Sequence, residues 1–151
     1  AKFYVSVFKG AKISHMSRYT EGNHMPAGTV LTATVRIGDQ ELVLLNGGPI
    51  YTLTPGISLF VNCKTQREVD SVWAKLAKDG KELRCGWITD KFGVTWQIVP
   101  EGLHEAIQHP AALKAMFTMT KLDIHVLRKA AKSGIVVPVS KATKKATPRK
   151  K

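Results

Sequence analysis

The polar side chain with the clearest chemical potential lies in the middle of a predicted strand. The segment DKFGVTWQIVP, residues 90–100, is typical of a tight turn followed by a strand that ends at a proline. Gln97 stands in that strand among large apolar residues, and strand alternation directs its side chain away from the face of Trp96. A buried amide must be hydrogen-bonded within the fold, whereas an amide in a cleft can bind the polar atoms of a ligand. Both interpretations stay open at this stage.

Four more side chains are candidates for lining the same cleft. Asn62 lies in a second predicted strand, and its amide has the same two interpretations. Trp87 and Trp96 flank the turn of a predicted hairpin, so one of them can face a pocket while the other packs in the core. Asn46 precedes two glycines that permit a tight turn, and shaping that turn is its simpler role.

The histidines and cysteines have no spacing that predicts a metal or catalytic site. The five histidines form no H-x-x-x-H or H-E-x-x-H pair, and no Ser-His-Asp or Cys-His set can be assembled from the sequence. Cys63 and Cys85 lie in apolar, strand-like contexts, which is typical of reduced, half-buried thiols in a cytoplasmic protein. A disulfide between them stays open if their strands are neighbours.

Positive charge is concentrated at the C-terminal end. Residues 1–127 carry 14 basic and 11 acidic residues, whereas residues 128–151 carry 9 basic residues and no acid. Such a segment can bind phosphate backbones without sequence preference, or it can simply keep the protein soluble. The candidate nucleic-acid contacts in this alternative are Lys141, Lys144, Lys145, Arg149, Lys150 and Lys151.

The elements that must position these side chains follow from hydrophobic periodicity and from turn residues. Strands are predicted over residues 11–19, 29–37, 40–46, 57–63, 81–88 and 94–99. Helices are predicted over residues 2–9, 65–78, 101–109 and 111–131, with a break near residues 109–110. This order predicts an α+β fold of two modules, about 1–50 and 56–131, within one domain of residues 1–131. Residues 132–151 are then a basic, flexible tail.

Membrane insertion and secretion are not expected. The sequence has no run of about 18 apolar residues. Its first ten residues, AKFYVSVFKG, also lack the charged and apolar regions of a signal peptide. We therefore expect a cytoplasmic protein with no membrane partner.

Several segments together carry a resemblance to a known family. The segments FYVSVF, LNGGP, ISLFVNC with TQREVD, CGWITDKFG and TWQIVP resemble the PhnB-like branch of the vicinal oxygen chelate superfamily, which includes glyoxalases and extradiol dioxygenases. More closely, they are similar to the group named for 3-demethylubiquinone-9 3-methyltransferase, over residues 2 to about 131. This resemblance implies paired βαβββ modules around a cleft that dimerisation completes. It also implies that the first module is truncated, because the usual first strand does not precede FYVSVF. The chain is then a fragment, or another element or subunit covers the open sheet edge.

The resemblance further implies that this chain lacks part of the metal-binding site of the superfamily. In many members a glutamate ligand follows the aspartate of the turn by seven residues, and here that position is Gln97. A neutral amide is a weak metal ligand, and the first strand normally supplies another ligand. We therefore expect no cofactor and no metal ligands, although a divalent metal stays possible.

The leading hypothesis is a metal-free homodimer that binds a small molecule in a cleft lined by Gln97, Trp96 or Trp87, Asn62 and residues near Asn46. The competing hypothesis is a metal-dependent lyase or dioxygenase-like enzyme. A third hypothesis is a nucleic-acid-associated protein that uses the basic tail. The methyltransferase name has no counterpart in the residues, because LNGGP leads to a proline and not to a nucleotide-binding helix.

Overall fold

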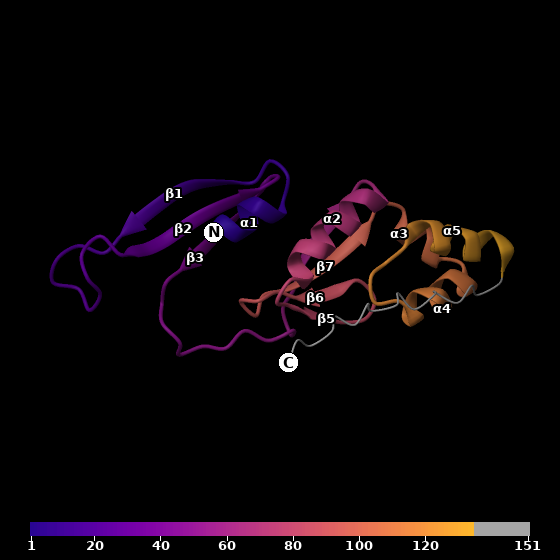
Figure 1. The fold of residues 1–151 in the computed structure, drawn as a ribbon. Helices are drawn as coiled ribbons and strands as arrows, with labels where there is room; N and C mark the ends of the chain where they lie inside the picture. The colour runs from indigo at the N-terminus through magenta and orange to yellow at the C-terminus, as the bar shows by residue number, and fades with distance from the viewer. Residues whose placement is uncertain (135–151) are drawn as a thin grey trace, which may run out of the picture.

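The structure is a computed structural model that describes residues 1–134. Three parts follow one another along an elongated molecule, as Figure 1 shows. A three-stranded sheet lies at one end, a four-stranded sheet lies in the middle, and three short helices form the other end. The mixed α+β class predicted from the sequence is confirmed.

The first part consists of one short helix and an antiparallel sheet. Helix α1 spans Lys2–Val7, and the strands are β1 (Lys12–Arg18), β2 (Val30–Ile37) and β3 (Gln40–Leu45), in the order β1-β2-β3. Gly38 and Asp39 form the two-residue turn between β2 and β3, with Gly38 at φ 58°. The helix and the three strands agree with the predicted positions. Among residues 1–134 no strand pairs with the outer edge of β3.

The second part is a complete βαβββ module. Its elements are β4 (Leu59–Cys63), α2 (Gln66–Ala77), β5 (Lys81–Glu82), β6 (Trp87–Thr89) and β7 (Thr95–Pro100). The sheet order is β4-β7-β6-β5, with β4 parallel to β7 and the other pairs antiparallel. Thr65 caps α2 by accepting a hydrogen bond from the Glu68 N–H, as the capping motif predicts.

One predicted strand of this module is wrong. Residues 81–88 form two strands, β5 and β6, which fold back on each other instead of running straight. The reversal uses left-handed backbone at Cys85 (φ 57°) and Gly86 (φ 81°). A cysteine rarely takes this conformation, so neither its residue type nor the apolar residues around it predicted a turn here.

The C-terminal part contains three helices where the sequence predicted two. They are α3 (Leu103–Ile107), α4 (Pro110–Thr118) and α5 (Ile124–Ser133). The predicted break near residues 109–110 is confirmed, but the predicted continuous helix over 111–131 is interrupted at residues 119–123. Asp123 begins α5 by accepting hydrogen bonds from the N–H groups of His125 and Val126.

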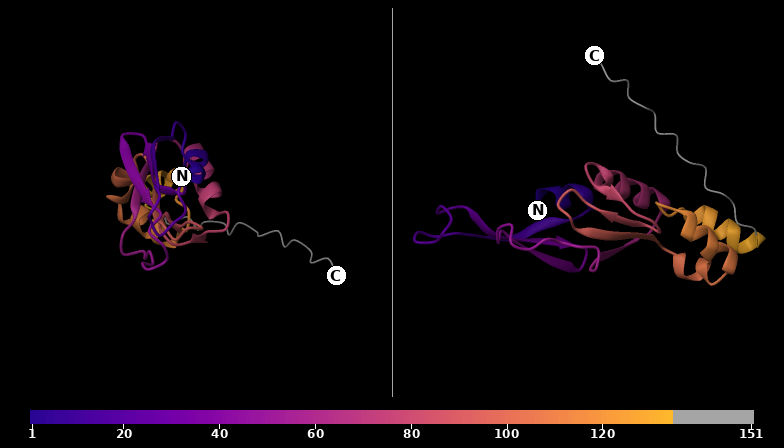
Figure 2. Two further views of the ribbon diagram at one scale, coloured as in Figure 1. Left: turned by 90° about the vertical axis from the view of Figure 1, so that its left-hand side faces the viewer. Right: turned by 90° about the horizontal axis from the view of Figure 1, so that it is seen from below.

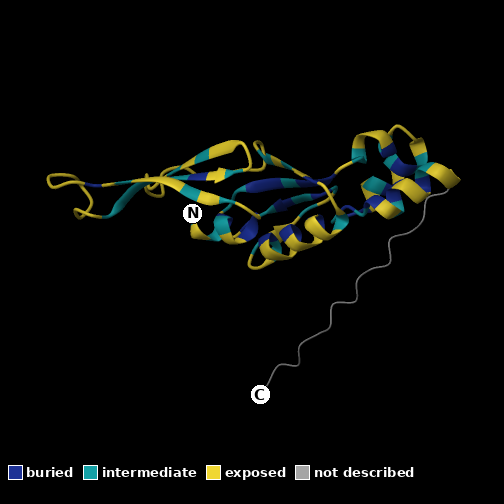
Figure 3. Cartoon of the chain, turned by 90° about the horizontal axis from the view of Figure 1, so that it is seen from above, coloured by how far each residue is buried: buried dark blue, intermediate teal, exposed yellow. Residues whose placement is uncertain are grey.

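Helix α1 joins the two sheets through a common core. Tyr4, Val7 and Phe8 are at most 5% exposed and pack in one cluster with Val35 of β2 and Trp96 of β7. Figures 2 and 3 show that α1 and α2 cover the same side of the molecule, and that none of the helices within residues 1–134 covers the opposite faces of the sheets. This layering leaves one face of each sheet available for binding.

The helices of residues 1–134 are too short to cross a bilayer. The longest is α2, with 12 residues.

Candidate functional site

The register of the second sheet places Gln97 between two aromatic side chains. Gln97 on β7 is the pairing partner of Phe60 on β4 and of Trp87 on β6. Paired residues share a face of a sheet, and adjacent strands lie about 4.8 Å apart, so the two rings flank the glutamine. Asn62 follows Phe60 by two residues and therefore lies on the same face. We call this set the Gln97 face.

The Gln97 amide is hydrogen-bonded on one side only. Its Nε2 donates to Ser58 Oγ at 2.8 Å, and its other amide atom has no hydrogen-bond partner among residues 1–134. Amide nitrogen and oxygen are assigned from such contacts, but in either orientation one atom stays available to a ligand. The side chain is half-buried, so a molecule on the sheet can reach that atom.

The Gln97 face is most open at β4. Phe60 is 63% exposed, and Asn62 is also exposed. At the start of β7 the face is closed, because Thr95 is 1% exposed and its hydroxyl group is hydrogen-bonded to that of Thr89 on β6 at 3.1 Å. Among residues 1–134 the face is therefore an open surface with aromatic and amide groups at β4, and no pocket encloses it.

Trp96 lies on the other side of the sheet and does not line this face. It is 2% exposed, and its ring contacts those of Tyr4 and Phe8 at centroid distances of 5.3 and 5.0 Å. Strand alternation separates it from Gln97, the next residue. Of the two tryptophan candidates, only Trp87 therefore accompanies Gln97.

Asp90 organises the core beneath this sheet. Its carboxylate accepts hydrogen bonds from Tyr4 Oη at 2.8 Å, Trp96 Nε1 at 2.9 Å, and the N–H groups of Phe92 and Val94. Burial, together with the hydrogen bond and charge of Asp90, raises the pKa of Tyr4 well above its ordinary value, so Tyr4 keeps the proton it donates. Asp90 is only 4% exposed, and these bonds indicate a structural role.

Asn46 belongs to a different part of the molecule. It follows β3 in the three-stranded sheet, donates from Nδ2 to the Val30 carbonyl at 3.2 Å, and accepts from Tyr19 Oη through its own carbonyl. Asn46 therefore stabilises the end of a hairpin, and no contact joins it to Gln97. The candidate tail residues Lys141, Lys144, Lys145, Arg149, Lys150 and Lys151 lie outside the described residues.

The described residues do not fit the metal ligand set that the superfamily implies. Within residues 1–134 no group of three His, Cys, Asp or Glu side chains is placed to hold a metal ion. His15 lies on the open face of the other sheet, opposite Thr34, while Gln97 supplies a neutral amide. We therefore derive no step that passes through a metal.

The two thiols are free and do not form a disulfide. Cys63 is fully buried, and burial, with a smaller contribution from the charge of Glu68, raises the pKa of its thiol to about 12. A thiol with this pKa stays protonated at neutral pH and is a poor nucleophile. The expectation of reduced cysteines agrees with this geometry.

Sequence reasoning missed Phe60 of the Gln97 face and Ser58, the hydrogen-bond partner of Gln97. Phe60 and Ser58 belong to the predicted strand ISLFVNC, in which alternation puts Ser58, Phe60 and Asn62 on one face. That signal was present, but only the parallel pairing of β4 with β7 brings this face beside Gln97.

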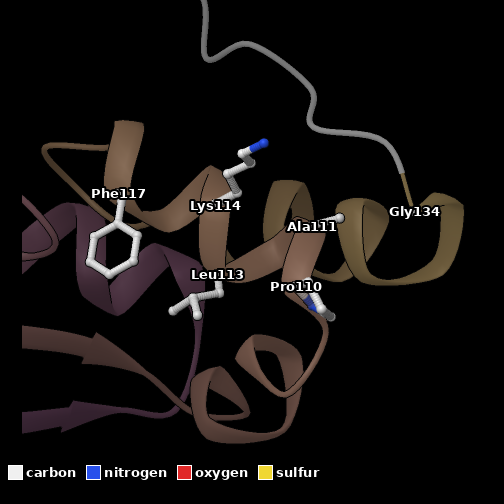
Figure 4. A pocket seen from close by; sticks show the side chains of 6 residues that line it. All are labelled: Pro110, Ala111, Leu113, Lys114, Phe117 and Gly134. Carbon is white, nitrogen blue, oxygen red and sulfur yellow. The ribbon is translucent and has the colours of Figure 1, made fainter.

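A hollow of about 450 Å³ lies elsewhere, on the C-terminal helices (Figure 4). Its lining consists of Pro110, Ala111, Leu113, Lys114, Phe117 and Gly134. The lining is mostly apolar, and none of the candidate site residues contributes to it.

Comparison with known proteins identifies the family. The family model described as 3-demethylubiquinone-9 3-methyltransferase matches residues 1–99. The PhnB protein from Bacillus cereus is 37% identical, with a TM-score of 0.59, over 66% of this chain and 86% of that chain. Protein PA1353 from Pseudomonas aeruginosa shows the same fold, with 22% identity and a TM-score of 0.55 over 66% of this chain and 85% of that chain. No curated protein matches the chain.

The resemblance inferred from the sequence is thus confirmed, and over residues 100–131 it stays a prediction. The chain belongs to the 3-demethylubiquinone-9 3-methyltransferase family and has the PhnB-like fold of the vicinal oxygen chelate superfamily.

Proposed function

We propose that this PhnB-like protein binds a small planar molecule on the Gln97 face without a metal ion. The observation that carries the proposal is the second amide atom of Gln97, which lies between Phe60 and Trp87 and has no hydrogen-bond partner among residues 1–134. A planar ring over Gln97 would contact apolar side chains at both edges and form one directional hydrogen bond, which is the usual composition of a ligand site.

A second copy of the chain would complete the site. The Gln97 face is open, and large apolar side chains are exposed on the helix-free faces of both sheets, including Val43 and Leu45 at 66% and Phe60 at 63%. Monomeric proteins rarely leave such groups uncovered when they lie together. In the proposed homodimer, the partner covers these residues and excludes water from the ligand.

Metal-dependent lyase or dioxygenase-like chemistry is the competing function. Measuring the metal content of the purified protein by mass spectrometry separates the two proposals. We expect iron, manganese, nickel and zinc to stay far below one ion per chain, and a stoichiometric ion would contradict the metal-free proposal. Methyl transfer has no support from the residues, because Gly47 and Gly48 lead into an irregular segment and not into a helix.

The binding proposal can be tested with two probes of similar shape. We would titrate the protein with 2-naphthol and with 2-methylnaphthalene, and follow tryptophan fluorescence. Gln97→Leu should weaken 2-naphthol binding by about 5- to 20-fold, because it removes one hydrogen bond. It should leave 2-methylnaphthalene binding unchanged.

The matched control is Gln108→Leu, which changes an exposed glutamine at the end of α3. It should bind both probes like the unaltered protein. Equal affinity of Gln97→Leu and the unaltered protein for 2-naphthol would show that this amide binds no ligand hydroxyl.

A further inference from the structure

Helix α5 carries its basic residues on one face. His125, Arg128, Lys129 and Lys132 follow the i, i+3, i+4, i+7 spacing of a single helix face, and all four are exposed. They line a shallow hollow of about 450 Å³ together with Ser133. We call these four residues the α5 basic face.

The orientation of this face is set by packing. On the other side of α5, Ile124, Leu127 and Ala130 are at most 4% exposed and form a cluster with α3 and α4. The guanidinium group of Arg128 lies close to Gly102, just before α3. A Cβ added at Gly102 would be only 2.7 Å from Arg128 Nη2. The helix cannot turn its basic side inward without exposing this apolar core.

The positive charge of the face is not neutralised by ion pairs. The one salt bridge found among residues 1–134 joins Lys121 to Asp70, so no residue of the α5 basic face takes part in a salt bridge there. Helix α5 itself contains no acidic residue. Asp123, just before the helix, is already engaged in capping its first N–H groups.

The composition of the face favours a duplex phosphate backbone as its partner. It has no aromatic side chain on which the bases of a single strand could stack. It also has no exposed apolar residue to enter a lipid layer, because the apolar side of α5 is buried. Three permanent cations on a helix about 15 Å long suit the spacing of phosphates on a duplex.

Further positive charge lies near the C-terminus of the sequence, where residues 141–151 contain six Lys or Arg residues and no acid. Because this charge also attracts polyanions at low salt, a test must separate its effect from that of α5. We propose that the α5 basic face binds the backbone of double-stranded DNA, independently of the small-molecule site.

The test measures how the affinity of the full chain for a 20-base-pair duplex depends on salt, by fluorescence anisotropy. The face variant is Arg128→Gln, Lys129→Gln and Lys132→Gln together. It should weaken binding tenfold or more at low salt, and should reduce the slope of log K against log salt by about 2 to 3. A tail variant changes Lys141, Lys144, Lys145, Arg149, Lys150 and Lys151 to Gln, and in this background the face variant should still reduce the slope by about 2 to 3.

Two controls separate the face from total charge. Lys2→Gln, Lys9→Gln and Lys12→Gln together remove the same charge from exposed positions in the first part of the molecule and should change the slope by less than about 1. Lys129→Arg with Lys132→Arg keeps the charge and should keep the affinity. Circular dichroism would verify that each variant is folded.

Three results would overturn the proposal. The first is a face variant that binds the duplex like the unaltered protein, because the tail alone would then suffice. The second is a face variant that loses no more affinity for the duplex than the control in which Lys2, Lys9 and Lys12 are changed. The third is stronger association with vesicles of 30% phosphatidylserine in phosphatidylcholine than with the duplex, because the partner would then be a lipid surface.

Discussion

At the scale of single residues, Asp90 connects three parts of the chain. Its carboxylate bonds to Tyr4 on α1, to Trp96 on β7, and to the turn between β6 and β7. A buried carboxylate is stable only when such donors replace its water. Asp90 therefore holds the sheet that presents Gln97 against the helix that joins the two parts.

Replacing Asp90 by alanine should destabilise the protein by about 3 kcal/mol or more. The change leaves the Tyr4 hydroxyl and the Trp96 indole N–H buried without an acceptor, and it also removes the bonds that order the turn. Urea denaturation followed by circular dichroism would measure the free energy of unfolding.

Tyr4→Phe provides the matched control for this prediction. It removes one hydrogen bond and should cost about 1–2 kcal/mol in the unaltered protein. In the Asp90→Ala background it should cost less than about 0.5 kcal/mol, because the partner is already absent. Equal costs in both backgrounds would mean that the pair contributes nothing to stability.

At the scale of elements, the position of α1 depends on its neighbours. The helix has six residues, too few to be stable alone, and Lys75 of α2 donates to the carbonyl groups of Ser6 and Val7 near its end. The end of α2 is held in turn by a close approach at Gly80. A Cβ there would lie 2.4 Å from the Leu76 carbonyl oxygen and 2.7 Å from that of Thr89.

Gly80→Ala should therefore lower the free energy of unfolding by about 1–3 kcal/mol. Both neighbouring atoms are backbone oxygens, so the new methyl group must push the end of α2 away from β6. Thermal and urea unfolding would measure the change. Gly47→Ala is the control, because the atoms nearest to its added Cβ are side-chain carbons at 3.4 and 3.5 Å, and it should change stability little. Equal stability of the two variants would contradict the prediction.

At the scale of the whole molecule, the open sheet faces predict self-association. Phe60→Glu and Val43→Glu each place a charge on an apolar face that we propose is covered by the partner. Each should raise the dimer dissociation constant at least tenfold, because the charge loses its water in the interface. Sedimentation equilibrium would measure this constant.

Phe117→Glu is the matched control for the dimer prediction. Phe117 is 55% exposed, but it lies on helix α4 and belongs to neither sheet. This variant should associate like the unaltered protein. A monomeric unaltered protein at 100 μM would contradict the homodimer altogether.

The sequence predicted the order of elements well, because local rules decide most of it. Alternation identified β2, β3 and β7, and the capping motif at Thr65 identified the start of α2. The sequence-based prediction was wrong at residues 81–88 and 119–123, because tertiary contacts form the turns there. The Cys85 and Gly86 N–H groups, for example, donate to the carbonyl groups of Met119 and Thr120.

For the candidate site, the sequence by itself determined the family, the polarity of Gln97, and its separation from Trp96. These follow from residue types and from the two-residue period of a strand. Only the tertiary structure decided which face α1 and α2 cover, and hence that Trp96 is core while Gln97 stays accessible. The tertiary structure also places Asn46 at the end of β3 in the other sheet, and it places Phe60 and Ser58 beside Gln97. Strand pairing and helix packing join residues distant in sequence, and local periodicity carries no information about these long-range contacts.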